Sequence, residues 1–205
     1  EKSDMINTVA ILETVSYFIS SKITNHRLMV ELEHASRHDA LTGLHNRNAC
    51  MEKIDFLTKY SSSVGIVYAD VNGLKEINDT LGHQAGDAAL RQAARLLTKC
   101  YGLENTYRIG GDEFLVLVPL VTELDFKTSV CRLRELVAGK ADLSIAIGSE
   151  WVADTAHLER VITKTDQRMY CDKVEYYNRR GKKRETRHDL NDFRRMAAKS
   201  LPIAD

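Results

Sequence analysis

Residues 106–119 read Thr-Tyr-Arg-Ile-Gly-Gly-Asp-Glu-Phe-Leu-Val-Leu-Val-Pro, and this stretch decides the fold. Two short apolar runs, 106–109 and 114–118, flank a glycine pair that permits positive φ angles and a close approach of other groups to the backbone. The pattern predicts a β-hairpin. Asp112 and Glu113 follow the glycines with no basic neighbour, and adjacent carboxylates at a turn repel each other unless a cation lies there. The turn is therefore a candidate cation site, with a solvated hairpin tip as the alternative.

A second acid lies at the end of another predicted strand. Residues 64–69 read Val-Gly-Ile-Val-Tyr-Ala, which is short and β-branched enough for a central strand, and Asp70 follows directly. A rigid strand end fixes a carboxylate at the edge of a sheet. If the sheet sets Asp70 beside Asp112, the pair offers two hard oxygen ligands for Mg²⁺, which prefers few carboxylates together with waters and phosphates. The alternative is that Asp70 only caps a helix.

Two further motifs accompany the hairpin. Residues 39–47 read Asp-Ala-Leu-Thr-Gly-Leu-His-Asn-Arg, and residues 70–79 read Asp-Val-Asn-Gly-Leu-Lys-Glu-Ile-Asn-Asp, followed by Gly82-His83 and Gly86-Asp87. In this order, together with the five letters of residues 110–114, the motifs resemble the GGDEF domain family, the diguanylate cyclases. The resemblance covers about residues 37–178.

The resemblance implies an enzyme that condenses two GTP molecules into cyclic di-GMP and releases pyrophosphate. It implies that Asp70, the Val71 carbonyl and Asp112 hold Mg²⁺, with Mn²⁺ as a substitute. Asp112 or Glu113 would assist loss of the 3′-hydroxyl proton, so the implied catalytic residues are Asp70, Asp112 and Glu113.

The resemblance also implies a binding site for the nucleotide. Asn78 and Asp87 match the family's guanine readers, and a carboxylate suits the N1–H and N2–H donor pair that adenine lacks. Each has a plainer alternative, since Asn78 can cap a turn and Asp87 can favour a helix start. The remaining implied contacts are with the phosphates and ribose, and they fall on Gly73, Leu74, Lys75, Gly110, Gly111 and Lys173.

Four positions depart from the family pattern. The late motif reads Tyr-Cys-Asp-Lys at residues 170–173, with Asp172 in place of the usual alanine. Tyr177 stands where the family has an arginine, so phosphate binding from this side is expected to be weaker or to be taken over by Arg179. The family's inhibitory product site, Arg-x-x-Asp, is replaced by Tyr101 and Glu104. A GTP-binding regulatory module without cyclase activity is therefore the alternative function.

The first 36 residues are predicted to form a signalling helix. Residues 5–37 lack proline and glycine, and a seam at alternating steps of three and four is typical of a coiled coil: Val9, Leu12, Ser16, Ile19, Ile23, His26 and Val30. We expect it to hold a homodimer together. The alternative is an amphipathic helix packed on its own domain.

The complete expectation is an α/β sandwich with a mostly antiparallel sheet flanked by helices, similar to nucleotide cyclases, at residues 37–178. The expected order of elements is α-β-α-α-β-β-α-β-α. Besides the strand and hairpin above, it comprises a helix capped near Asn46–Asn48 and ending at about 60, helices at 74–81, 87–100, near 123–137 and about 155–176, and a strand at 143–147. In the helix at 87–100, one face is apolar: Leu90, Ala93, Ala94 and Leu97.

Residues 179–205 form a basic tail with a helix expected at about 190–198. Lys+Arg and Asp+Glu both number 29, so no global charge indicates DNA as a partner. The four separated cysteines and the lack of a long apolar run favour a cytoplasmic domain with no membrane segment. The chain begins at Glu1 without methionine, which suggests an upstream sensor in a longer protein.

Overall fold

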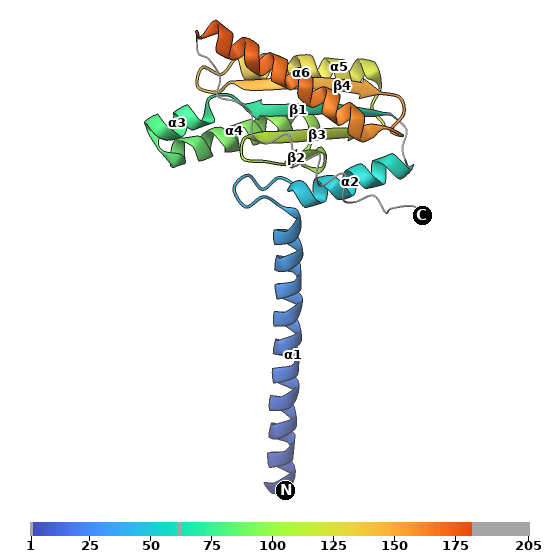
Figure 1. The fold of residues 1–205 in the computed structure, drawn as a ribbon. Coiled ribbons are helices and arrows are strands. Elements are labelled where there is room, and N and C mark those ends of the chain that lie inside the picture. Colours follow the sequence, from blue (N-terminus) through green and yellow to red (C-terminus); the bar gives the residue numbers. More distant parts are fainter. Residues whose placement is uncertain (1, 61–62, 182–205) are drawn as a thin grey trace, which may run out of the picture.

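The computed structural model describes residues 2–60 and 63–181. The elements follow the predicted order, with α1 leading the chain (Figure 1). Their bounds are α1 Lys2–Arg37, α2 Arg47–Tyr60, β1 Val64–Val71, α3 Leu74–Leu81, α4 His83–Tyr101, a 3-10 turn Leu103–Asn105, β2 Thr106–Arg108, β3 Glu113–Pro119, α5 Glu123–Ala138, β4 Ile145–Val152 and α6 Leu158–Arg179.

The sheet confirms the predicted fold class. Its four strands lie in the order β2-β3-β1-β4, and every neighbouring pair is antiparallel. Strand β1 is central and buried along its whole length. Because side chains alternate along a strand, Val67, Ala69 and Val71 face one helical layer, while Ile66 and Tyr68 face the other.

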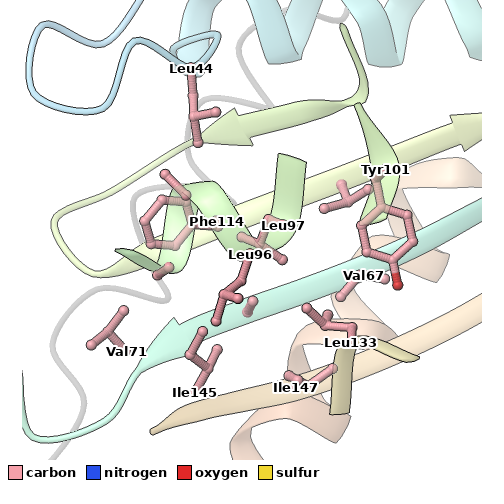
Figure 2. Packing of buried hydrophobic residues seen from close by; sticks show 14 of the residues in the cluster. Leu44, Val67, Val71, Leu96, Leu97, Tyr101, Phe114, Leu133, Ile145 and Ile147 are labelled. Carbon is pink, nitrogen blue, oxygen red and sulfur yellow. The ribbon is translucent and has the colours of Figure 1, made fainter. Parts of the chain in front are cut away.

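Two apolar cores fill the two faces of this sheet. Helices α4 and α5 cover one face, where Leu97 and Leu133 pack with Phe114 and Val67 (Figure 2). Helices α2 and α6 cover the other, through residues such as Ile54 and Met169. The predicted α4 face, Leu90, Ala93, Ala94 and Leu97, is buried as expected. Asp70 has the strand parity of Ile66 and Tyr68, so its side chain is on the α6 face.

Several predicted boundaries differ from the structure. Strand β4 was expected at 143–147, but it begins at Ile145 and continues to Val152. It pairs with β1 as far as Val64, and the polar residues in its second half hide the strand pattern. Helix α6 begins and ends three residues later than the expected 155–176. Helix α4 begins at His83, ahead of the expected Asp87, after Gly82, whose φ is positive (83°).

The hairpin glycines are a further correction. Positive φ angles occur at other glycines of the described chain, and Gly110 and Gly111 are not among them. The hairpin turn therefore uses these glycines for the space they leave rather than for left-handed backbone.

Helix α1 projects away from the sandwich as a straight rod (Figure 1). The described side chains between Val15 and Met29 are almost all exposed, including the seam residues Ile19 (52%) and Ile23 (63%). The alternative in which this helix packs on its own domain is thus wrong for this part of α1. Pairing with a second chain stays a prediction, and the expected helix at 190–198 lies outside the described residues. None of the described helices has the length and apolar character needed to cross a membrane.

Candidate functional site

The sheet brings the two candidate metal ligands together. Asp70 is the penultimate residue of β1 and pairs in register with Glu113, the first residue of β3. The Val71 amide donates to the Asp112 carbonyl oxygen at 3.0 Å, which ties the hairpin turn to the end of β1. The hairpin and the central strand therefore present Asp70, Asp112 and Glu113 at one end of the sheet.

A lysine from α6 completes this cluster. The Lys173 ammonium donates to both carboxylate oxygens of Asp70 and lies 3.6 Å from Asp112 Oδ2. The side chains of Lys173 and Asp70 are almost fully buried, at 8% and 5% exposure. Burial, followed by the negative charge of Asp112, raises the pKa of Asp70 to about 7, although Lys173 opposes the shift. A carboxylate in this environment requires positive charge beside it.

The carboxylate oxygens of Asp70 and Asp112 are the type of ligand that Mg²⁺ prefers. In the described part of the chain, no three or more His, Cys, Asp or Glu residues form a cluster able to hold a metal. Mg²⁺ does not need such a cage, because it is bound through one or two carboxylates, waters and substrate phosphates. Asp70 and Asp112 supply the two carboxylates, and the Lys173 ammonium marks where their charge attracts a cation.

Glu113 is held by a tyrosine that the sequence does not single out. The Tyr68 hydroxyl donates to Glu113 Oε2 at 3.3 Å across the β1–β3 pair. A Cβ on Gly110 would lie 3.0 Å from the same oxygen, whereas a Cβ on Gly111 would meet nothing within 4 Å. Gly110 therefore gives room to the Glu113 carboxylate, and Gly111 leaves an open surface beside Asp112. The strand parity of Tyr68 is the only sequence signal for its role.

An ion pair connects the hairpin to the motif at residues 39–47. Arg108 Nη1 donates to Asp39 Oδ1 at 2.9 Å and to Oδ2 at 3.1 Å, and Nη2 donates to the Gly111 carbonyl oxygen at 2.7 Å. Burial raises the pKa of Asp39, but hydrogen bonds from Thr42 and Arg108 more than offset this, so the pKa lies below its ordinary 3.8. The motif at residues 39–47 thus positions, through Arg108, the turn that carries Asp112.

The two candidate guanine readers lie on packed helices. A Cβ on Gly86 of α4 would lie 1.9 Å from the Asn78 side-chain oxygen, so only glycine lets α3 place Asn78 against α4. Asp87 follows Gly86 directly, and both polar residues are half-buried. The structure therefore brings together the two elements that carry Asn78 and Asp87.

The loop expected to bind phosphates leads into α3. Gly73 has φ 71° and precedes Leu74, the first residue of α3, whose N-terminus has no side-chain cap. The positive end of a helix and its free N–H groups favour anions. The Gly73 N–H donates to the Tyr177 hydroxyl oxygen at 3.2 Å. Leu74 is half-buried and Lys75 exposed.

On α6, Asp172, which departs from the family pattern, and Arg179 both form specific contacts. Asp172 Oδ2 accepts the Ile147 N–H at 2.8 Å, and Arg134 Nη2 donates to the Ile147 carbonyl oxygen at 2.8 Å. Because β4 is an edge strand, these side chains satisfy backbone groups that have no neighbouring strand. Arg179 forms an exposed ion pair with Glu175 at 3.2 Å, on the surface of α6.

Tyr101 and Glu104, which replace the family's inhibitory site, differ in burial. Tyr101 is 7% exposed and packs into the core beside α5 (Figure 2). Its ring therefore does not extend into solvent, where it could meet a ligand. Glu104 is exposed.

Comparison with known proteins agrees with the family resemblance of the sequence motifs. The family model described as "Diguanylate cyclase, GGDEF domain" matches residues 36–179. Diguanylate cyclase DgcM of Escherichia coli K12 is 30% identical over 168 residues, covering 75% of this chain and 40% of DgcM. Cyclic di-GMP phosphodiesterase PdeB of Shewanella oneidensis is 31% identical over 118 residues, covering 57% of this chain and 13% of PdeB. The chain thus spans less than half the length of either relative.

A solved structure supports the fold. The coiled coil and GGDEF domain of DgcB from Caulobacter crescentus, in complex with c-di-GMP, superposes with a TM-score of 0.71. The match covers 80% of this chain and 95% of that one at 20% identity, and at this identity it shows a shared fold.

Proposed function

Because the family model matches most of its length, the chain belongs to the GGDEF family, and we propose that it condenses two GTP molecules into cyclic di-GMP. The observation that carries the proposal is the cluster at the end of β1. There the buried Asp70 lies with Asp112 around the Lys173 ammonium, and Tyr68 holds Glu113 nearby. Burying charged groups such as Asp70 and Lys173 costs free energy, and a hairpin tip that is only solvated would not require it.

In the proposed reaction, the 3′-oxygen of each GTP forms a bond to the α-phosphorus of the other. The bond from that phosphorus to the β-phosphate oxygen breaks, pyrophosphate leaves, and each hydroxyl loses its proton. Bound Mg²⁺, or Mn²⁺ in its place, supplies charge neutralisation and Lewis acidity. Asp70, Asp112 and the Val71 carbonyl are the groups of this chain that would hold it.

The protein side chains supply proton transfer and positioning. The Glu113 carboxylate, held by the Tyr68 hydroxyl, is placed to accept the 3′-hydroxyl proton, with Asp112 as the second candidate. Gly111 presents open backbone to the ribose and α-phosphate. Lys173 can turn from the carboxylates to the phosphates because an ammonium on a four-carbon stem is adaptable.

The proposed choice of base follows from Asp87. Its carboxylate accepts the paired N1–H and N2–H of guanine, and Asn78 serves the remaining edge. The experiment is incubation of the 205-residue chain with Mg²⁺ and either GTP or ATP, with products identified by mass. We expect cyclic di-GMP from GTP and formation of any cyclic dinucleotide from ATP about tenfold or more slower, because leaving the half-buried Asp87 carboxylate unpaired costs about 1–3 kcal/mol. Equal turnover of ATP would refute the assignment.

A second candidate function is a GTP-binding regulatory module, and Tyr177 in place of an arginine favours it. The same incubation separates the two, since such a module would bind GTP and return it unchanged. In either case we propose that α1 connects the domain to an upstream sensor in a cytoplasmic signalling protein.

The proposed reaction also requires two chains, because one domain has one set of GTP ligands and the product contains two nucleotides. We propose that the α1 seam holds two protomers so that their sites face each other. Exposed isoleucines such as Ile19 and Ile23 gain by burial against a second copy.

Replacing Ile19 and Ile23 by aspartate in the full chain tests this dimer. Specific activity at low protein concentration should fall roughly a hundredfold and rise again with concentration, because linked partners gain a large effective concentration. Asn25→Asp, an exposed position off the seam, is the control. A double variant whose activity is flat with concentration and equal to the parent's would show that α1 does not assemble the site.

A further inference from the structure

The contact between Tyr177 and Gly73 joins the last turn of α6 to the loop before α3. The Tyr177 hydroxyl oxygen accepts the Gly73 N–H at 3.2 Å, across 104 residues of sequence. Gly73 has a left-handed backbone, and a Cβ there would lie 3.9 Å from the Tyr176 hydroxyl. Two tyrosines of α6 therefore lie close to the loop that leads into α3.

Tyr177 and Lys173 form one stripe along α6. They are four residues apart, so they share a helix face one turn from each other. Lys173 reaches Asp70 near the end of β1, and Tyr177 reaches Gly73 three residues further along the chain. The same stripe thus touches both the acidic cluster and the start of α3.

The Tyr177 hydroxyl has its own proton still to donate. A phenol can accept one hydrogen bond and donate another. In the described part of the chain its oxygen accepts from Gly73, and we find no acceptor for its proton. Accepting a bond from an N–H polarises the hydroxyl and makes it a better donor. Tyr177 is half-buried, and its hydroxyl oxygen lies at the Gly73 N–H, one residue before the first residue of α3.

We propose that Tyr177 is a substrate-binding residue that donates its hydroxyl proton to the β- or γ-phosphate of GTP while its oxygen stays on the Gly73 N–H. This rests on the proposed function, because it assumes that the triphosphate lies between Lys173 and α3. Lys173 supplies the positive charge, and Tyr177 supplies a directed neutral donor that reads the phosphates beyond the α-position. The tyrosine therefore takes part in triphosphate binding by a different chemistry from a guanidinium.

The test is the affinity of the full chain for two nucleotides in the presence of Mg²⁺. The probes are 3′-deoxy-GTP, which cannot be cyclised because it has no 3′-hydroxyl, and GMP, whose single phosphate is the α-phosphate. Tyr177→Phe removes only the hydroxyl. Tyr60→Phe removes a hydroxyl from an exposed tyrosine at the end of α2 and serves as the matched control.

We expect Tyr177→Phe to bind 3′-deoxy-GTP about tenfold more weakly, the usual effect of losing a hydrogen bond to a charged group. Its affinity for GMP should be unchanged, and Tyr60→Phe should match the parent for both probes. This difference between the probes is one that a purely structural role would not produce.

Three results would overturn the proposal for Tyr177 and leave the proposed function standing. These are unchanged affinity for 3′-deoxy-GTP, an equal loss for GMP, and tighter binding by Tyr177→Phe. The last would mean that the hydroxyl competes with the phosphate for the Gly73 N–H. A parent chain that binds neither 3′-deoxy-GTP nor GTP would overturn both this proposal and the proposed function.

Discussion

The hairpin and helix α6 approach the end of β1 from two sides, and they differ in how closely they follow the family pattern. On the hairpin side the signature is intact, and Asp112 and Glu113 lie beside Asp70 as the motif implies. On the α6 side Lys173 is kept, but Asp172 and Tyr177 replace the usual residues. Both replacements form specific contacts, with Ile147 and with Gly73.

The difference shows that a residue that departs from the family pattern can still form a specific structural contact. Asp172 satisfies a backbone group of the edge strand β4, and Tyr177 satisfies one in the loop before α3. An unsatisfied polar group that is buried costs free energy, so these contacts stabilise the site's surroundings. We therefore expect the hairpin to set the rate of reaction and α6 to set the stability and the grip on the phosphates.

The largest effect should come from the hairpin. Asp112→Ala removes a carboxylate from the reacting end of β1 and should lower turnover by about a hundredfold or more. The fold should remain, because the Asp112 side chain is 38% exposed in a turn. Cyclic di-GMP production and thermal unfolding are the measurements, with the exposed Asp55→Ala as control. A folded Asp112→Ala protein that retains near-normal turnover would remove the hairpin from the mechanism.

Two glycine substitutions compare the sides directly. A Cβ on Gly148 would lie 2.1 Å from the Thr165 carbonyl oxygen of α6, so Gly148→Ala should destabilise the protein by about 3 kcal/mol through overpacking. A Cβ on Gly111 would meet nothing within 4 Å, so Gly111→Ala should leave the free energy of unfolding unchanged. It should lower turnover, because the methyl group would occupy the surface proposed for the ribose and α-phosphate. Denaturant unfolding and product formation on both variants check this. If Gly111→Ala also unfolded, or if Gly148→Ala were neutral, the proposed division between the two sides would be wrong.

The ion pair behind the hairpin gives a pH-dependent effect. The folded pKa of Asp39 lies below 3.8, so its contribution to stability is present above about pH 4 and is lost as the pH falls through the folded pKa. Asp39→Asn should therefore cost about 2 kcal/mol at pH 7, the order expected for hydrogen bonds to a charged group. The gap between parent and variant should narrow in acid. A gap that stays constant from pH 7 to pH 3 would mean that Asp39 does not act through its charge.

The smallest effect concerns the edge of the sheet. Asp172→Ala leaves the Ile147 N–H without its partner and should cost about 1 kcal/mol, with turnover unchanged. Glu175→Ala, one turn away by the helix spacing, breaks only an exposed ion pair and should change stability by less than about 0.5 kcal/mol. Equal stability of the two variants would show that Asp172 does not protect the edge of β4.

The sequence predicts those features of the fold and the site that depend on local residue patterns and on position along a strand. The order of elements, the burial of β1 and the position of Asp70 at the end of a central strand all follow from periodicity and turn residues. The helix bounds are right where a cap is recognisable, as at Asn46, whose side chain accepts the Ala49 N–H at 3.1 Å. The end of β4 was missed because polar residues there continue the pairing.

The contacts that tune the site could not be read from the sequence. Asp39 and Arg108 are 69 residues apart, and Gly73 and Tyr177 are 104 apart, and no local signal joins either pair. Lys173 was expected to bind phosphates, and its contact with Asp70 appears only when α6 is packed on the sheet. The roles of the individual site residues in catalysis remain predictions.

The most direct test of the account is the fate of GTP when it is incubated with the unaltered 205-residue chain and Mg²⁺, with Asp112→Ala in parallel. We predict that the parent produces cyclic di-GMP and pyrophosphate in a ratio of one to two, as two condensations per product require, while the variant produces almost none. If the parent binds GTP and returns it intact, the contacts of Asp172 and Tyr177 have kept a fold without its chemistry, and the account is contradicted.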